Sequence, residues 1–269
     1  MAATVGKRYI GNTDVELSLL GLGTVKFGRN QSVKYPGNFN LPDDKTIEHL
    51  LAIAREVGMT TLDTAPAYGI AEERLGNLLN EQRKQWEIIT KAGEIYHPEL
   101  DQSSFDFSPR GLQKSLENSL RKLHTDYIDC WLLHSDGNDV EYLNDDVIDC
   151  LQKAKQDGWV RSIGMSTKTV KGGKLALQHL DCIMMTASLK NTDEMELLDI
   201  ATLLGKGIIL KKIYDSGWAL TSDNKLDIMK ETMQNLFSYA SVCSAIVGTI
   251  NPAHLQENID SLKAALGTP

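Results

Sequence analysis

The sequence predicts an α/β protein folded as a closed (β/α)8 barrel, the TIM-barrel class. Eight short apolar runs alternate with eight longer segments of helical period, which is the pattern of successive strand–helix units. These pairs occupy residues 17–265 and average about 31 residues each, the length of one such unit. No Pro-, Gly- or Ser-rich linker interrupts them, so one domain over residues 1–269 is expected. An open, doubly wound sheet stays as the alternative.

The eight apolar runs are the expected barrel strands, because each is short and is followed by polar or helix-start residues. They cover residues 17–22, 60–62, 87–90, 127–133, 160–165, 182–185, 207–210 and 245–247. A short hairpin is expected before them, over residues 8–17, with its turn at Gly11 and Asn12.

Start signals define several of the helices between these runs. Ser108 and Asn251 are capping residues, and each directly precedes a proline, which suits the first position of a helix. Another helical segment starts at Asp43, directly after Pro42. The expected helices cover residues 43–57, 71–80, 108–123, 144–156, 168–178, 193–204, 225–239 and 252–265.

The composition narrows the class of protein. With 42% hydrophobic and 24% charged residues, the chain has the make-up of a globular protein with a large core. Lys and Arg number 28 against 36 Asp and Glu, and this net charge of −8 argues against a nucleic-acid or membrane partner. The absence of a long apolar segment, a signal peptide or paired CxxC cysteines predicts a cytoplasmic protein with reduced thiols and no metal site. Oligomeric state stays open.

Polar residues follow three successive predicted strands, at the end of the barrel where active sites lie. They are Asp63, Lys91 and His134, and Tyr68 lies in a short loop after the first of them. Asp63 and Lys91 would end neighbouring strands roughly 5 Å apart, so an ion pair is expected. A tyrosine hydroxyl beside an ammonium has a pKa below its usual value of about 10 and can act as a general acid. The four residues therefore predict a site that transfers a proton to or from a carbonyl or alcohol oxygen.

Several motifs, in chain order, resemble those of the aldo-keto reductases, particularly a bacterial-type branch with a short C-terminus. The segment from Leu62 to Gly69 reads LDTAPAYG and looks like the family signature. Further blocks that resemble the family lie at residues 89–91, 115–134, 158–166, 207–212 and 246–258. The resemblance implies an oxidoreductase that reduces the carbonyl of aldehydes, ketones or sugars with a nicotinamide cofactor.

The same resemblance assigns roles to the four polar residues. Tyr68 would donate the proton, Lys91 held by Asp63 would tune it, and His134 would orient the small carbonyl substrate. The hydride would come from the reduced cofactor. By analogy with the family, the cofactor-binding residues would be Gly23, Thr24, Ser166, Thr167, Met184, Lys211, Lys212, Ser216, Gly217, Gly248, Thr249, His254, Glu257 and Asn258.

The departures from the family pattern concern the cofactor. Thr167, Met184 and Lys211 stand where the family usually has Asn, Gln and an aromatic residue. His254 stands at the position of an Arg that binds the 2′-phosphate, and a neutral His binds phosphate more weakly than Arg. NADP is the expected cofactor, and NAD stays possible.

The shape of the substrate pocket and the activity leave alternatives. Residues 26–41, with Phe27, Tyr35 and Phe39, are either a lid or a solvated surface loop. Because the chain ends soon after its last expected helix, a rather open pocket is expected. Besides a reductase, the chain could be a cofactor-binding regulatory or sensor subunit with little turnover. A lyase or isomerase using Lys91 as a Schiff base is disfavoured, because Asp63 would keep that amine charged.

Overall fold

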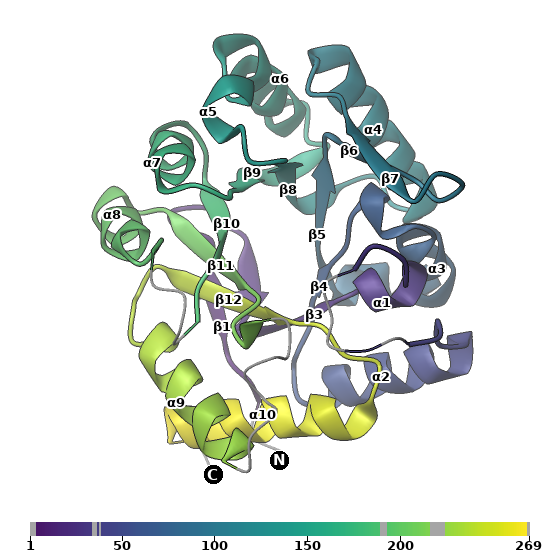
Figure 1. The fold of residues 1–269 in the computed structure, drawn as a ribbon, viewed down its shortest axis with the longest axis vertical. Helices are drawn as coiled ribbons and strands as arrows, with labels where there is room; N and C mark the ends of the chain where they lie inside the picture. Colours follow the sequence, from purple (N-terminus) through teal and green to yellow (C-terminus); the bar gives the residue numbers. More distant parts are fainter. Residues whose placement is uncertain (1–3, 34–36, 38, 189–192, 216–223, 268–269) are drawn as a thin grey trace.

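Eight parallel strands close into a ring, and the helices lie around its outside (Figure 1). The computed structural model describes residues 4–33, 37, 39–188, 193–215 and 224–267. Around the ring, the strands are β3 (Leu20–Gly23), β4 (Thr61–Asp63), β5 (Glu87–Ala92), β8 (Ile128–His134), β9 (Val160–Ser166), β10 (Cys182–Thr186), β11 (Gly207–Lys211) and β12 (Val242–Val247). The predicted (β/α)8 barrel is confirmed, and its closure leaves no barrel strand with an unpaired edge.

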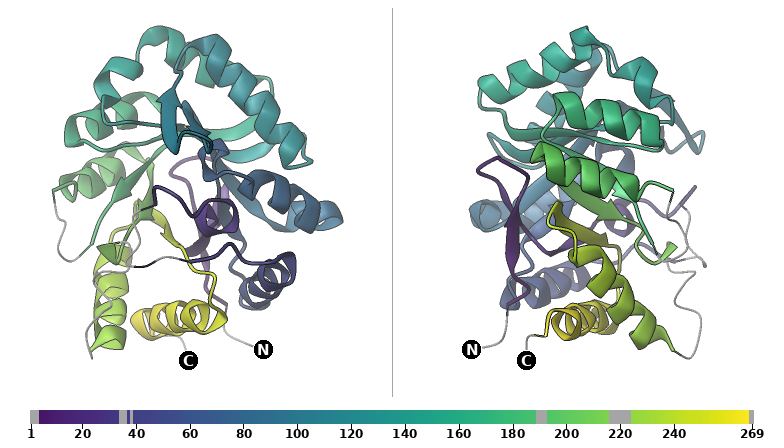
Figure 2. Two further views of the ribbon diagram at one scale, coloured as in Figure 1. Left: turned by 45° about the vertical axis from the view of Figure 1, so that its right-hand side comes forward. Right: turned by 90° about the vertical axis from the view of Figure 1, so that its left-hand side faces the viewer.

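The eight expected helices are all present, within a few residues of their expected ends. They surround the strands in each of the views in Figure 2. Ser108 accepts a hydrogen bond from the Gly111 amide and Asn251 accepts one from Ala253, so both expected caps start their helices. The helices are α2 (Asp44–Glu56), α3 (Ala71–Leu79), α4 (Pro109–Lys122), α6 (Asp145–Gln156), α7 (Val170–His179), α8 (Glu196–Leu204), α9 (Lys225–Phe237) and α10 (Pro252–Leu266).

The N-terminal hairpin forms, but its connection is longer than expected. Strands β1 (Lys7–Tyr9) and β2 (Glu16–Ser18) pair antiparallel. The chain between them packs against the loop before β11, where a side chain at Gly11 would collide with the Gly205 carbonyl oxygen. The expected strand at residues 17–22 is therefore wrong as one element: the Ser18 hydroxyl donates to the Leu20 carbonyl, and the barrel strand starts only at that residue.

Further short elements lie in segments that were expected to be loops. They are α1 (Val25–Gly28), the 3-10 helices η1 (Pro66–Tyr68) and η2 (Asn80–Gln85), the antiparallel pair β6 (Glu94–His97) and β7 (Gln102–Phe105), and α5 (Asp139–Tyr142). Of the aromatic residues in the segment that was left open between a lid and a solvated loop, Phe27 is fully buried in the core and Phe39 is half-buried. Tyr35 lies outside the described residues.

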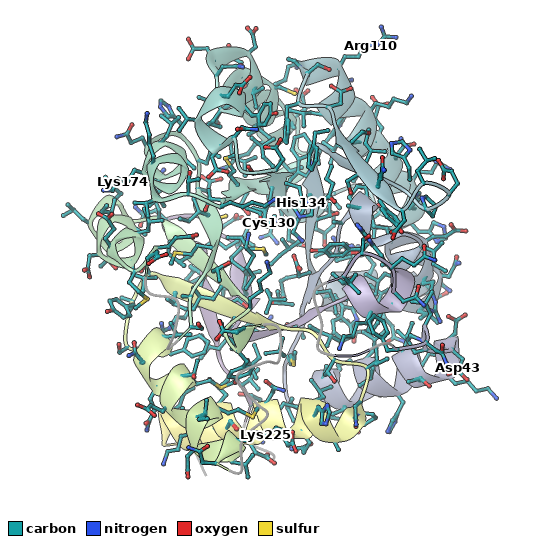
Figure 3. All side chains as sticks on the ribbon, in the orientation of Figure 1. Asp43, Arg110, Cys130, His134, Lys174 and Lys225 are labelled. Atoms are coloured by element: carbon teal, nitrogen blue, oxygen red, sulfur yellow. The ribbon has the colours of Figure 1, made fainter. Side chains whose placement is uncertain are left out.

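The barrel interior is apolar and carries most of the cysteines. Cys130, Cys182 and Cys243 are buried there, Cys150 is half-buried on α6, and all of them are free thiols. Figure 3 labels Cys130 and His134, both from β8, near the middle of the ring. In the part of the chain that the structure describes, no helix is both long and apolar enough to cross a bilayer.

Candidate active site

A cavity of about 630 Å³ lies at the carboxyl ends of the barrel strands, a size typical of small-molecule sites. Strand ends all around the ring contribute to its wall, together with the start of α10 and the segment that contains α1. The residues from the ends of the eight strands are Gly23, Asp63, Lys91, His134, Ser166, Met184, Lys211, Ile246 and Val247. The cavity thus occupies the end of the barrel at which the sequence placed the site.

The Asp63 and Lys91 side chains form a buried ion pair inside this cavity. Lys91 Nζ lies 2.5 Å from Asp63 Oδ1 and also donates to the Thr64 carbonyl oxygen at 2.8 Å. The Lys91 side chain is only 1% exposed, and a charge buried to this extent requires such partners. These contacts fix the position of the ammonium.

Tyr68 ends η1 directly above this ion pair. Lys91 Nζ lies 4.7 Å from the centre of the Tyr68 ring, and the ring stands edge-on to His134 with 6.1 Å between the ring centres. The turn after the tyrosine needs Gly69, whose φ is 64° and where any side chain would collide with the Gly28 carbonyl oxygen. The four residues proposed for acid–base chemistry therefore line one cavity, within contact of one another.

A fifth polar residue, Glu94, belongs to this group and was missed by the sequence reasoning. It begins β6, and its Oε2 lies 2.9 Å from His134 Nδ1, while Ser103 donates to its Oε1 at 2.6 Å. Burial raises the pKa of Glu94, but His134, Ser103 and Arg29 outweigh this and lower it to about 2. The carboxylate therefore stays ionised. We refer to Asp63, Tyr68, Lys91, Glu94 and His134 as the acid–base cluster.

Arg29 connects the elements around this cluster, and it too was missed. Its Nη1 donates to the Ala67 carbonyl oxygen at 3.1 Å and lies 3.7 Å from Glu94 Oε1. Its guanidinium stacks on the Tyr96 ring, 3.6 Å from the ring centre. One side chain thus ties the expected lid segment to η1 and to the β6–β7 hairpin. Only its basic character and its place in that segment could have drawn attention to it.

The opposite wall of the cavity has a different character. Lys211 Nζ donates to Ser166 Oγ at 2.7 Å and to the Thr167 carbonyl oxygen at 3.1 Å. Burial, reinforced by the neighbouring charge of Lys212, lowers the pKa of Lys211 to about 7. Met184 completes this wall as an apolar surface.

The start of α10 and the segment before it also line the cavity, through Gly248, Thr249, His254, Glu257 and Asn258. Asn258 donates to the His254 carbonyl oxygen at 2.6 Å, but its own Oδ1 is buried without a hydrogen-bond partner among the described residues. The Glu257 carboxylate pairs with Lys225. The dipole of a helix start favours an anion here. We refer to Lys211, Lys212, Lys225 and His254 as the cationic side.

Most of the expected cofactor residues line this cavity, with a few exceptions. Thr24 and Thr167 are fully buried, and neither side chain belongs to the residues that line the wall. Thr24 instead donates to the Asp63 carbonyl oxygen at 3.0 Å, so its hydroxyl connects strands β3 and β4. Ser216 and Gly217 lie outside the described residues.

A (β/α)8 barrel whose strand ends and a helix start line one cavity, with several ionisable side chains in its wall, is an arrangement that suits a barrel oxidoreductase. The chain belongs to the aldo/keto reductase family, whose sequence model matches residues 19–236. A crystal structure of a Pseudomonas aeruginosa protein assigned to the aldo-keto reductases is 43% identical, with a TM-score of 0.87 over 98% of both chains.

Curated relatives are oxidoreductases as well. The uncharacterized oxidoreductase YqkF of Bacillus subtilis is 26% identical over 96% of this chain and 91% of its own length. The NADH-specific methylglyoxal reductase of Escherichia coli is 28% identical over 71% of this chain and 62% of its own length. These similarities agree with an enzyme that uses a nicotinamide cofactor.

Proposed function

We propose that this protein reduces the carbonyl group of an aldehyde, ketone or sugar by hydride transfer from NADPH, with NADH as the alternative donor. The observation that carries this proposal is the shared cavity, in which the acid–base cluster and the start of α10 face one volume. One end can transfer a proton, and the other can hold the phosphates of a dinucleotide. The relatives support a small carbonyl substrate, since one of them is a methylglyoxal reductase.

The residues on the cationic side fit a nicotinamide dinucleotide. Lys212, His254 and the amides at the start of α10 would hold its phosphates. Asn258 Oδ1 is a buried acceptor that has no partner among the described residues, so it can accept a hydrogen bond from the adenine amine. When bound, the cofactor supplies the hydride.

The acid–base cluster handles the proton in this proposal. Tyr68 holds the proton that goes to the carbonyl oxygen, and the adjacent Lys91 ammonium stabilises the phenolate that remains. Asp63 fixes the position of that ammonium. The same ion pair argues against Lys91 as a Schiff-base amine, because an amine held charged is a poor nucleophile.

Binding and turnover measurements test the proposal. The protein is titrated with NADPH and NADH while the fluorescence of its four tryptophans is recorded, and a panel of aldehydes, ketones and sugars follows. Binding with turnover supports a reductase. Binding without turnover across the panel favours the regulatory or sensor subunit instead. If neither nucleotide binds, the proposal is wrong.

A further inference from the structure

The environment of His134 determines which hydrogen bonds this ring can offer in the cavity. Nδ1 is buried, and the Glu94 carboxylate 2.9 Å away is the acceptor within reach. The contact is not aligned as a strict hydrogen bond, and Nδ1 has no other hydrogen-bond partner among the described residues. An ionised carboxylate at this distance attracts an N–H and repels a lone pair.

The charged and titratable neighbours of His134 come from several elements. Glu94 on β6 favours protonation of the ring, whereas Lys91 on β5 and Lys211 on β11 oppose it, and Tyr68 on η1 presents its ring edge. Burial is the largest influence and lowers the pKa of His134 below its ordinary value. At neutral pH the neutral form of the ring is therefore favoured.

We propose that Glu94 is a positioning residue that fixes the tautomer of His134, with Nδ1 protonated and Nε2 bare. A bare Nε2 accepts a hydrogen bond, so the neutral ring binds the hydroxyl of an alcohol but not the oxygen of a carbonyl. Only the protonated ring donates to a carbonyl oxygen. This inference depends on the proposed function. It adds that carbonyl reduction requires the protonated form of His134, whereas alcohol oxidation requires the neutral form.

The support of Glu94 shows that this contact is built into the fold. Ser103 on β7 holds the other carboxylate oxygen, and Arg29 lies between this carboxylate and the Ala67 carbonyl beside Tyr68. The β6–β7 hairpin thus presents one carboxylate to His134. A second Glu–His pair on the same hairpin, Glu99 and His97, is solvent-exposed and 3.7 Å apart, and it provides a matched control.

The tautomer is measured directly by long-range ¹H–¹⁵N NMR of the His134 ring, without substrate or cofactor. We expect the wild-type protein at neutral pH to carry the proton on Nδ1, and Glu94→Ala to gain a population protonated on Nε2. Ser103→Ala, which keeps the carboxylate, should retain the wild-type tautomer. If the wild-type ring carries its proton on Nε2, the inference is wrong, regardless of which substrates the enzyme reduces.

Kinetic pH profiles test the consequence. The ordinary pKa of histidine is about 6.5, and the pKa of His134 lies below it. Once the pH exceeds the pKa of His134, kcat/KM of the wild type for carbonyl reduction should fall by up to tenfold per pH unit. Glu94→Gln keeps an acceptor but removes the charge that favours protonation, so this fall should begin at a lower pH. Glu99→Gln should leave the profile unchanged. Superimposable profiles for wild type and Glu94→Gln contradict the inference, whereas absent nucleotide binding contradicts the proposed function.

Discussion

The two sides of the barrel mouth differ in the partners that hold their charged side chains. In the acid–base cluster, the buried Lys91 ammonium faces the Asp63 carboxylate, and the Glu94 carboxylate lies 2.9 Å from the His134 ring. On the cationic side, Lys225 pairs with Glu257, whereas Lys211 is held by a hydroxyl and a carbonyl oxygen, neither of which carries a full charge. Paired charges keep reacting groups fixed in place. Positive charge that is only partly balanced is what an incoming phosphate requires, all the more in a protein of net charge −8.

The largest effect is expected from Tyr68→Phe, which removes a single oxygen atom from the acid–base cluster. If Tyr68 is the proton donor, kcat for carbonyl reduction should fall about 10²- to 10⁴-fold, while the affinity for NADPH stays the same. Steady-state kinetics and fluorescence titration measure the two quantities. Tyr9→Phe, at a mostly exposed position on β1, is the control. A variant that retains most of its kcat would remove Tyr68 from the proposed mechanism.

Lys91→Met tests whether the Lys91–Asp63 ion pair stabilises the acid–base cluster. The substitution leaves the Asp63 carboxylate buried without its cation, so the free energy of unfolding should fall by about 3–5 kcal/mol. Urea unfolding measures this loss. The double variant with Asp63→Asn should lose less than the sum of the two single variants. Lys7→Met breaks the more exposed Lys7–Glu87 pair and should cost at most about 1 kcal/mol; a similar cost at Lys91 would contradict the comparison.

On the cationic side, His254→Arg tests where the phosphate binds. An arginine at the start of α10 offers a charged fork of donors, so the Kd for NADPH should fall about tenfold, or about 1.4 kcal/mol. The Kd for NADH, which lacks the 2′-phosphate, should stay within about twofold. Fluorescence titration with both nucleotides measures the ratio. Equal changes for the two cofactors would show that His254 does not face the 2′-phosphate.

The difference between the two sides also shows what could be predicted from the sequence. The barrel follows from periodic apolar runs and capping residues, which are local signals such as Ser108 before Pro109. Asp63, Lys91 and His134 could be placed because strand ends meet at one end of a barrel. Glu94 could not, because the β6–β7 hairpin that carries it has little apolar alternation and its contact with His134 depends on how that hairpin folds back.

The burial of individual side chains could not be predicted from the sequence either. Phe27 resembles a lid aromatic in the sequence, yet its ring is in the core because α1 packs against α3. The contact between Lys211 and Ser166 joins residues far apart in the chain, and it depends on the side-chain conformation at the mouth. Such contacts are tertiary, so neither periodicity nor spacing encodes them.

The smallest expected effect concerns Lys211. Burial of its charge lowers the free energy of unfolding, and the size of this loss depends on pH. The unfolded chain keeps this lysine protonated up to about pH 10.4, whereas the folded protein releases the proton near pH 7. Between these values the unfolded state binds more protons, so the contribution of Lys211 to the free energy of unfolding rises with pH. Lys211→Met should therefore stabilise the protein by about 1 kcal/mol at pH 7.

Urea unfolding from pH 6 to 9 checks both the sign and the size of this effect. The stabilisation by Lys211→Met should shrink as the pH rises, because the wild-type lysine is then neutral in the folded state. Lys171→Met, at an exposed position on α7, should show no such trend. If Lys211→Met destabilises the protein at pH 7, the hydrogen bonds to Ser166 and Thr167 outweigh the cost of burying the charge. The cationic side would then be as well compensated as the acid–base cluster, and the contrast between the two sides would not hold.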